Sequence, residues 1–274
     1  ALGTRLDDIT SQNFSFPCYP QPEQPLVHCH PDPRVLGLHF ATEVGLACQP
    51  KSLLQAIEPL PTGPVLYPDT RRAWLQQLRR THEAIAAWPQ RVAADGVRFF
   101  EVVRHLRSLA SADLRLCLDA GTFAAPVYRH FGFDWPQRLM APLSGAMGYG
   151  VPAAIATALR EPQHPVVCMV GDGGFMMTGN EMILAVKRQL PIVFILANNG
   201  SYGSIRIHQD RAYPGRHPGT DLHNPDFAAL ARGFGMTAQT VDNEGQIESV
   251  LRRALSAQAP TFIEVKASLQ VTLP

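Results

Sequence analysis

The sequence predicts an α/β protein whose main part is a doubly wound parallel sheet with helices on both faces. Three observations lead to this fold class. Short segments between residues 114 and 265 are almost wholly apolar, helical segments separate them, and turns rich in Gly or Asn follow several of them. Strands without polar alternation are typical of parallel sheets covered on both faces, and such sheets bind ligands at the carboxyl ends of their strands.

The elements of the amino-terminal part suggest a smaller α/β unit and a connection. Within residues 1–57 the pattern predicts a strand over 25–30 and a helix over 50–57. Residues 58–90 are predicted to form an extended linker, with four prolines before residue 69, and then a basic amphipathic helix from Arg71 to Trp88. We expect this helix to pack on the following domain, with a membrane or partner protein as the alternative.

Residues 91–274 carry the regular alternation of helices and strands. Apolar strands are predicted over residues 114–118, 165–170, 191–197, 236–241 and 261–265. Helices are predicted over residues 97–109, 145–160, 181–189, 226–233 and 245–256. Residues 200–211 are predicted to form a loop after the third of these strands. Three polar or glycine-rich turns therefore fall at strand ends, where they can share one site.

Composition narrows the class of protein. The 274 residues allow one large domain or two modest ones, and 46% hydrophobic with 17% charged residues is typical of globular chains. Lys plus Arg total 24 against 23 for Asp plus Glu, so a net charge of +1 gives no support to nucleic-acid or anionic-membrane binding. No apolar run reaches the roughly 18 residues of a membrane span. We expect a small-molecule substrate and neither a nucleic-acid nor a membrane partner.

The cysteines and the chain start add two expectations. Five cysteines are scattered without a Cys-x-x-Cys pair, which fits neither a disulfide framework nor a structural zinc site, so a cytoplasmic location is expected. The chain begins at Ala1 without an initiator Met or a signal-like segment, which predicts a fragment of a longer protein.

Two of the strand-end turns have the residue types of a magnesium diphosphate site. Gly171-Asp172-Gly173-Gly174 follows one strand, and Asn198-Asn199 follows the next strand, with 24 residues between Gly173 and Asn198. Glycines let main-chain N–H groups approach a phosphate, and Asp and Asn side chains supply oxygen ligands. Mg²⁺ is normally held by few protein groups together with phosphate oxygens. The spacing therefore predicts a magnesium diphosphate site.

These motifs resemble the cofactor signature of thiamine diphosphate enzymes. The segment Leu143 to Ala156, crowded with Gly and Ala, is similar to the helix that wedges the cofactor in the acetolactate synthase-like branch of this family. The resemblance covers residues 91–274 as the thiamine diphosphate (pyrophosphate)-binding domain. It extends more loosely over residues 1–57 as the carboxyl-terminal part of a central α/β domain.

The resemblance implies roles for nine residues. Asp172 and Asn199 would ligate Mg²⁺ by side chain and Ser201 by its carbonyl, while Gly173 and Gly174 would offer N–H groups to the diphosphate. The resemblance implies four further residues in contact with the cofactor: Gly121, Thr122, Gly145 and Met147. Met147 would lie under the bend between the two cofactor rings, and the Gly145 carbonyl would accept from the aminopyrimidine.

Two positions depart from the family pattern. Phe123 stands where the synthases usually carry a polar histidine, and His208 stands where biosynthetic acetolactate synthases tend to have Trp. Arg206 and His208 are candidates for a substrate carboxylate, with an ordinary solvated position as the alternative. The resemblance therefore leaves the substrate open.

The function implied is decarboxylation of a 2-oxo acid with carboligation, dependent on thiamine diphosphate and Mg²⁺. The alternatives are a non-ligating decarboxylase of the benzoylformate type and a non-catalytic cofactor-binding fragment. The family's activating glutamate is expected on a pyrimidine-binding domain that residues 1–57 do not resemble. The resemblance also implies a homodimer or homotetramer with the site at a subunit interface, and it leaves FAD binding open.

Overall fold

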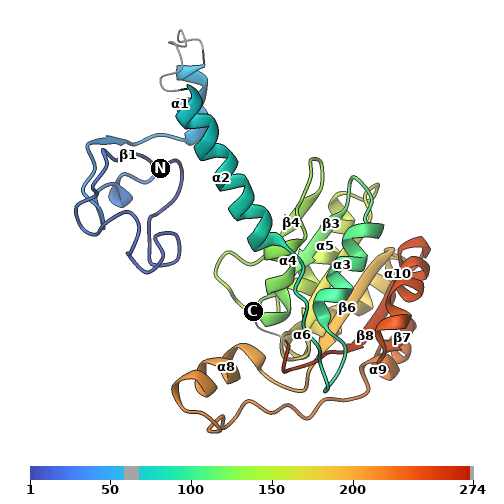
Figure 1. Cartoon of the computed structure of the whole chain (residues 1–274). Coiled ribbons are helices and arrows are strands. Elements are labelled where there is room, and N and C mark those ends of the chain that lie inside the picture. Colours follow the sequence, from blue (N-terminus) through green and yellow to red (C-terminus); the bar gives the residue numbers. More distant parts are fainter. Residues whose placement is uncertain (59–67, 272–274) are drawn as a thin grey trace. The chain divides into compact units, whose positions relative to one another are not determined.

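The structure is a computed structural model that describes residues 1–58 and 68–271 (Figure 1). The chain divides into two compact units, residues 1–74 and 75–274, so the division falls inside helix α2 (Pro68–Ala86). The domain bounds that we expect from the sequence stay a prediction. Residues 59–67 of the predicted linker lie outside the described residues.

The first unit contains a small parallel sheet. Strands β1 (Val27–Cys29) and β2 (Val44–Leu46) pair in register from Val27 and Val44. The 3₁₀ turn η1 (Pro33–Val35) lies between them, and helix α1 (Pro50–Ile57) follows. The strand and the helix predicted here are thus confirmed.

The second unit is built on six parallel strands in the order β4-β3-β5-β6-β8-β7. Their bounds are β3 (Arg115–Leu118), β4 (Arg138–Met140), β5 (Val166–Gly171), β6 (Ile192–Asn198), β7 (Thr237–Val241) and β8 (Thr261–Lys266). Every neighbouring pair in the sheet is parallel. The predicted doubly wound α/β class is confirmed.

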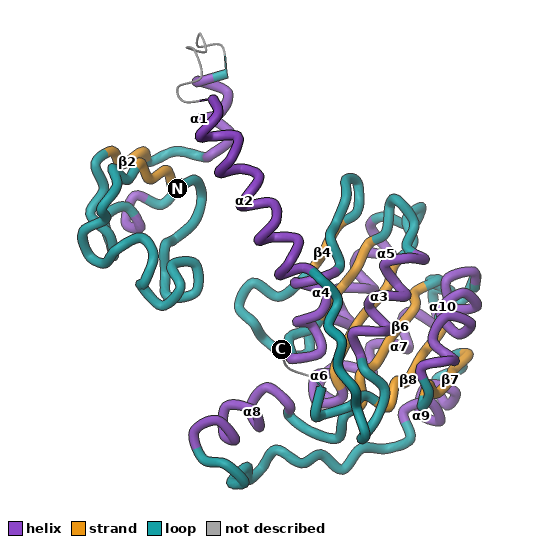
Figure 2. Tube along the Cα trace, in the orientation of Figure 1, coloured by secondary structure: helices purple, strands orange, loops and turns teal. Residues whose placement is uncertain are grey.

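Helices cover both faces of this sheet, as Figure 2 shows in purple against the orange strands. The helices are α3 (Phe99–Leu109), α4 (Ala125–His130), α5 (Gly150–Arg160), α6 (Asp172–Thr178), α7 (Met182–Lys187), α8 (Gly203–Ala212), α9 (Phe227–Gly233) and α10 (Ile247–Ser256). Three 3₁₀ turns, η2 (Thr122–Ala124), η3 (Gly179–Glu181) and η4 (Glu244–Gln246), complete the unit. None of the helices in the described part of the chain has the length and apolarity to cross a bilayer.

Apolar side chains on alternate strand positions fill two separate cores. Val193 and Ile195 of β6 pack in the core formed with α3, α4 and α10, whereas Ile192 and Phe194 pack with α5, α7 and α9. All four side chains are at most 4% exposed. Burial on both faces explains why these strands are apolar without a break.

The sheet order places a topological switch between β3 and β5. From β3 the chain continues to β4 at one edge, and from β5 it continues to β6 in the opposite direction. Open α/β sheets bind ligands in the crevice that forms at the carboxyl ends of such a strand pair. Residues 119–122 and 171–174 follow these two strands and are therefore placed at the crevice.

Two segments differ from the sequence prediction. The helix predicted over 145–160 begins only at Gly150, because Gly145 and Gly148 have φ of +68° and +85°, a left-handed conformation that no α-helix contains. The loop predicted over 200–211 is helical from residue 203 as α8. Residues 204–212 contain neither Gly nor Pro, so nothing in their composition interrupts a helix.

An aromatic cluster ties the start of α6 to the sheet, and its truncation should destabilise the second unit. Phe227 is fully buried on α9, with its ring 5.3 Å from that of Phe175, which lies 5.5 Å from Phe262 of β8. We expect Phe227→Ala to lower the free energy of unfolding by about 3–5 kcal/mol, measured by urea denaturation. Leu230→Ala, at a 37% exposed position of the same helix, is the control and should cost less than about 1 kcal/mol. Equal losses in the two variants would contradict this account.

Candidate functional site

A cavity of about 240 Å³ lies at the carboxyl ends of β3, β5 and β6, and it collects the residues predicted from the sequence. All nine line it: Gly121, Thr122, Gly145, Met147, Asp172, Gly173, Gly174, Asn199 and Ser201. They come from four separate stretches of the chain. Their ligand roles stay predictions, but the structure brings all nine to one place.

Asp119, directly after β3, holds the loop that precedes α5. Its carboxylate is fully buried and accepts hydrogen bonds from the N–H groups of Gly148 (3.0 Å to Oδ1) and Gly150 (3.1 Å to Oδ2). Burial raises the pKa of this carboxyl, although the main-chain N–H groups around it act in the opposite direction. Asp119 thereby fixes the loop that carries Gly145 and Met147. The sequence analysis assigned this residue no role.

Asp172 is the first residue of α6, and only 3% of it is exposed. Its Oδ2 accepts from the N–H of Gly200 (2.8 Å) and from Nδ2 of Asn224 (2.8 Å), and its Oδ1 accepts from the N–H of Gly173 (2.9 Å). Burial raises the pKa of the Asp172 carboxyl, and these hydrogen bonds oppose the rise. A buried carboxylate of this kind is stabilised in its charged form by a nearby cation.

The two other candidate ligands lie in the turn after β6. Asn199 Oδ1 accepts from the N–H of Ser201 (3.0 Å), which orients the amide. The hydroxyl of Ser201 donates to the carbonyl of Thr220 (2.9 Å). This hydrogen bond engages the side chain with loop 218–221, which leaves the main-chain carbonyl as the candidate ligand. Loop 218–221 thus supports the ligand turn from outside the predicted motif.

The turn shape depends on close approach between segments. An added Cβ at Gly173 would come within 2.5 Å of the Tyr202 ring and 3.3 Å of the Met147 methyl group. At Gly203 it would come within 3.0 Å of the Thr122 hydroxyl oxygen. A side chain at either position would have to displace one of these neighbours, so glycine keeps the segments in close contact at the cavity.

The residues present fit a magnesium diphosphate group. A carboxylate, an amide oxygen and a main-chain carbonyl are the hard oxygen donors that Mg²⁺ prefers. Within residues 1–58 and 68–271 no group of three or more His, Cys, Asp or Glu side chains could hold a metal ion by itself.

The sequence analysis did not find a series of side-chain hydrogen bonds that begins at Asp172. Asn224 Nδ2 donates both to Asp172 and to Asn198 Oδ1 (2.9 Å), and Asn198 Nδ2 donates to Glu264 Oε1 (2.7 Å). Glu264 on β8 is 1% exposed and also accepts from Lys266 Nζ (2.5 Å). A charged residue inside an otherwise apolar strand is the signal that could have indicated it.

The residues at which the sequence departs from the family pattern have distinct positions. Phe123 is 4% exposed, packs edge-on against Phe99 (6.0 Å between ring centroids) and forms an apolar wall of the cavity. Arg206 donates to Asp221 Oδ1 (2.6 Å) and also lies beside His217. His208 is exposed and lines a neighbouring cavity of about 290 Å³ that shares Gly121, Thr122 and Ser204 with the candidate site.

Comparison with known proteins gives the family. The family model described as "Thiamine pyrophosphate enzyme, C-terminal TPP binding domain" matches residues 119–265, more than half of the chain. The chain belongs to the thiamine pyrophosphate enzyme family. The resemblance seen in the sequence, including its acetolactate synthase-like branch, is thereby confirmed.

Among its relatives in this family are synthases and decarboxylases. The chain is 28% identical to the acetolactate synthase isozyme 2 large subunit of Escherichia coli, over 97% of this chain and 46% of that protein. It is 29% identical to benzoylformate decarboxylase of Pseudomonas aeruginosa, over 81% of this chain and 43% of that protein. The chain therefore spans less than half of the length of these relatives.

A solved structure shows the same fold. The thiamine diphosphate-dependent 4-hydroxybenzoylformate decarboxylase of Rhodococcus jostii RHA1 matches with a TM-score of 0.72 at 23% identity. The match covers 89% of this chain and 44% of that one. The sheet and the helices around the cavity are thus those of a thiamine pyrophosphate enzyme.

Loss of the Asp119 charge should release the loop before α5. In Asp119→Asn one oxygen becomes an NH₂ group that faces a main-chain N–H, which leaves a buried donor unpaired at a cost of roughly 1–3 kcal/mol. We expect the amides of Gly148 and Gly150 to exchange hydrogen at least about tenfold faster, measured by mass spectrometry or NMR. Asp113→Asn, before the opposite end of the same strand, is the control. Unchanged exchange at both glycines would show that Asp119 does not hold the loop.

Proposed function

We propose that this chain is the diphosphate-binding part of a thiamine diphosphate- and Mg²⁺-dependent enzyme that decarboxylates a 2-oxo acid and performs an acetolactate synthase-like carboligation. The observation that carries the proposal is the convergence of nine predicted residues on one cavity at the switch point of the sheet. The family membership supports the cofactor, and the synthase relatives support the reaction class.

In this proposal the chain binds the diphosphate end of the cofactor through main chain and cation. Asp172, Asn199 and the carbonyl of Ser201 would hold Mg²⁺, and the N–H groups of Gly173 and Gly174 would face the diphosphate. Thr122, next to Gly121 at the end of β3, would add a hydroxyl on the opposite side. Few side chains are needed, because the cation neutralises most of the phosphate charge.

The loop before α5 would orient the ring end of the cofactor. Met147 lies against Gly173, on the floor of the cavity, where it would support a bent cofactor, and the carbonyl of Gly145 would accept a hydrogen bond from the pyrimidine amine. The bound cofactor supplies an electron sink for loss of carbon dioxide from the 2-oxo acid. Phe123 would help to exclude water from the cavity. The glutamate that activates the cofactor is proposed to lie on a domain outside this chain.

There are two alternative readings of the function. A non-ligating 2-oxo acid decarboxylase is favoured by the match to a benzoylformate decarboxylase. A non-catalytic cofactor-binding protein is the remaining alternative. FAD stays an open proposal, because the residues that would bind it are expected in the central domain.

The first test measures cofactor binding and turnover of the chain itself. We expect calorimetry to show thiamine diphosphate binding that requires Mg²⁺ and is lost on chelation, without release of carbon dioxide from a 2-oxo acid. Asp172→Asn removes the buried charge opposite the cation and should weaken binding at least about tenfold. Asp242→Asn, at an exposed position, is the control. Binding that is independent of Mg²⁺ would contradict the proposed metal ligands. Turnover by this chain would contradict the proposal that the activating glutamate lies on another domain.

The reaction class is separated by a product assay on the longer protein that contains this chain. Release of carbon dioxide together with a 2-hydroxy-2-methyl-3-oxo acid-type ligation product supports the synthase reading. Release of carbon dioxide with only an aldehyde product, even with a second 2-oxo acid present, would overturn it in favour of the decarboxylase.

We further propose a homodimer or homotetramer with the site at a subunit interface. Large apolar side chains are exposed on two segments that also contribute residues to the cavity lining, the loop before α5 and α6: Leu143, Tyr149, Met176 and Met177. Such a group of exposed apolar side chains is typical of an interaction surface. Met176→Glu should shift sedimentation equilibrium of the longer protein toward monomer, whereas Met236→Leu, in the core, should not. A monomer in the parent protein would contradict the proposal.

A further inference from the structure

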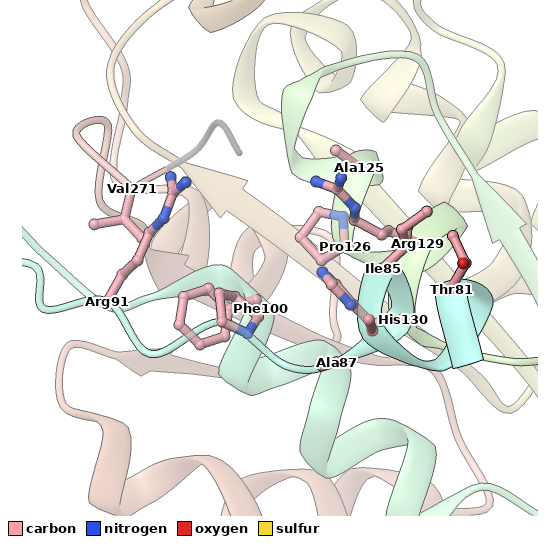
Figure 3. A pocket seen from close by; sticks show the side chains of 12 residues that line it. Thr81, Ile85, Ala87, Arg91, Phe100, Ala125, Pro126, Arg129, His130 and Val271 are labelled. Carbon is pink, nitrogen blue, oxygen red and sulfur yellow. The ribbon is translucent and has the colours of Figure 1, made fainter. Parts of the chain in front are cut away.

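A second cavity in the unit 75–274 has no residue in common with the candidate cofactor site. It has a volume of about 540 Å³ and lies between the end of α2, the residues that follow it, α3 and α4 (Figure 3). This volume is in the range of cavities that bind small molecules. The residues that line the cavity, and the contacts that hold them in place, indicate which ligands it could bind.

The floor of this cavity is apolar and partly fixed by the core. Phe100, at the start of α3, is 3% exposed, and Pro126 of α4 also lines the cavity (Figure 3). Ile85 of α2 extends this surface, and its side chain is 53% exposed. An exposed aliphatic side chain over a cavity of this size gains free energy when an apolar ligand covers it.

One wall is held by His130. Its Nδ1 is 3.0 Å from the carbonyl oxygen of Ala86, and its ring lies 5.1 Å from that of Trp88 between centroids. Trp88 in turn packs against the buried core of the unit. These contacts join the end of α2 to α4, so the wall is in place before a ligand binds.

The opposite wall is held by an ion pair. The carbonyl of Arg91 accepts from Nη1 of Arg98 (2.7 Å), and Arg98 donates to both oxygens of Glu244 (2.7 and 2.5 Å). The guanidinium of Arg98 also lies 5.3 Å from the centre of the Phe100 ring. The main chain of Arg91 is therefore anchored, while its side chain reaches the cavity.

The charged groups of the lining are all basic. Arg91 and Arg129 line the cavity, and its lining contains neither Asp nor Glu. In Figure 3 the two arginines lie on opposite sides of Phe100 and Pro126. Across the described part of the chain, the Arg129 guanidinium has no hydrogen bond or ion pair with another residue. A guanidinium beside an apolar floor is complementary to an organic anion.

We propose that this cavity binds a small organic anion with an apolar body. The apolar body would lie on Phe100, Pro126 and Ile85, and a carboxylate or sulfonate would face Arg129. The proposal is independent of the proposed function, because none of the nine cofactor-site residues takes part.

The test uses the aromatic sulfonate 1-anilinonaphthalene-8-sulfonate as probe, with saturating thiamine diphosphate and Mg²⁺ present. We expect a saturable rise in fluorescence with one site per chain, and Arg129→Met should weaken binding about tenfold or more. Arg188→Met removes an exposed arginine that does not line the cavity, and its affinity should equal that of the parent. Equal affinities in all three proteins, or displacement of the probe by thiamine diphosphate, would overturn the proposal.

A second variant and a neutral probe distinguish the contribution of the Arg129 charge to binding from that of the cavity volume. Ala84→Phe places a ring into the cavity from an exposed position of α2, so it should abolish binding of both the sulfonate and neutral N-phenyl-1-naphthylamine. Arg129→Met should leave the affinity for the neutral probe within about twofold of the parent. Binding of either probe that is unchanged in Ala84→Phe would place it elsewhere and overturn the proposal.

Two other occupants are distinguishable in the same experiment. If truncation after Val271 raised the affinity for the probe, the end of the chain would be a competing occupant. If the number of probe sites fell as protein concentration rose, a second copy of the chain would cover the cavity. Either result would overturn the assignment to a small organic anion, and affinity independent of both would support it.

Discussion

The burial of one carboxylate at the end of β3 determines the geometry of the candidate site. Asp119 has no exposed surface, and it accepts hydrogen bonds from the loop that precedes α5. A buried charge without partners would be very costly, so the loop must keep its N–H groups on the carboxylate. The positive φ of Gly148 and the late start of α5 follow from this requirement. Gly174 lies against the same carboxylate, so two sides of the cavity are fixed by one residue.

The buried carboxylate of Asp172 is likewise held by hydrogen bonds, and these extend across the sheet to β8. Hydrogen bonds connect Lys266 through Glu264, Asn198 and Asn224 to Asp172, and the two amides in the middle each have a defined orientation. Because the Asn198 NH₂ group is used by Glu264, its carbonyl faces Asn224, whose NH₂ group then reaches Asp172. A residue on β8 thereby orients hydrogen bonds to a candidate ligand on α6. Such networks are stable only when every member is satisfied, as here.

The sequence was sufficient for the fold class and for the motif residues, because both are local patterns. Unbroken apolar strands imply burial on both faces, and the Gly-Asp-Gly and Asn-Asn turns are contiguous in the chain. Asn224 and Glu264 could not be assigned in this way, since their roles depend on partners 26 to 66 residues distant. The start of α5 was misplaced for the same reason: the hydrogen-bond acceptor that unwinds residues 145–149 lies at Asp119. The second cavity is formed by segments with no motif in common.

The phenyl ring of Phe123 reduces the number of polar side chains that could contact a diphosphate in the candidate site. The resemblance predicts a polar histidine at this position, whereas here a buried phenyl ring packs against Phe99 and lines the cavity. On the β3 side, Thr122 is then the side chain left to donate to a diphosphate. In the proposed site, more of the phosphate charge would then have to be neutralised by the cation and by the main-chain N–H groups of Gly173 and Gly174. Affinity for the cofactor should accordingly depend more strongly on the cation here than where the histidine is present.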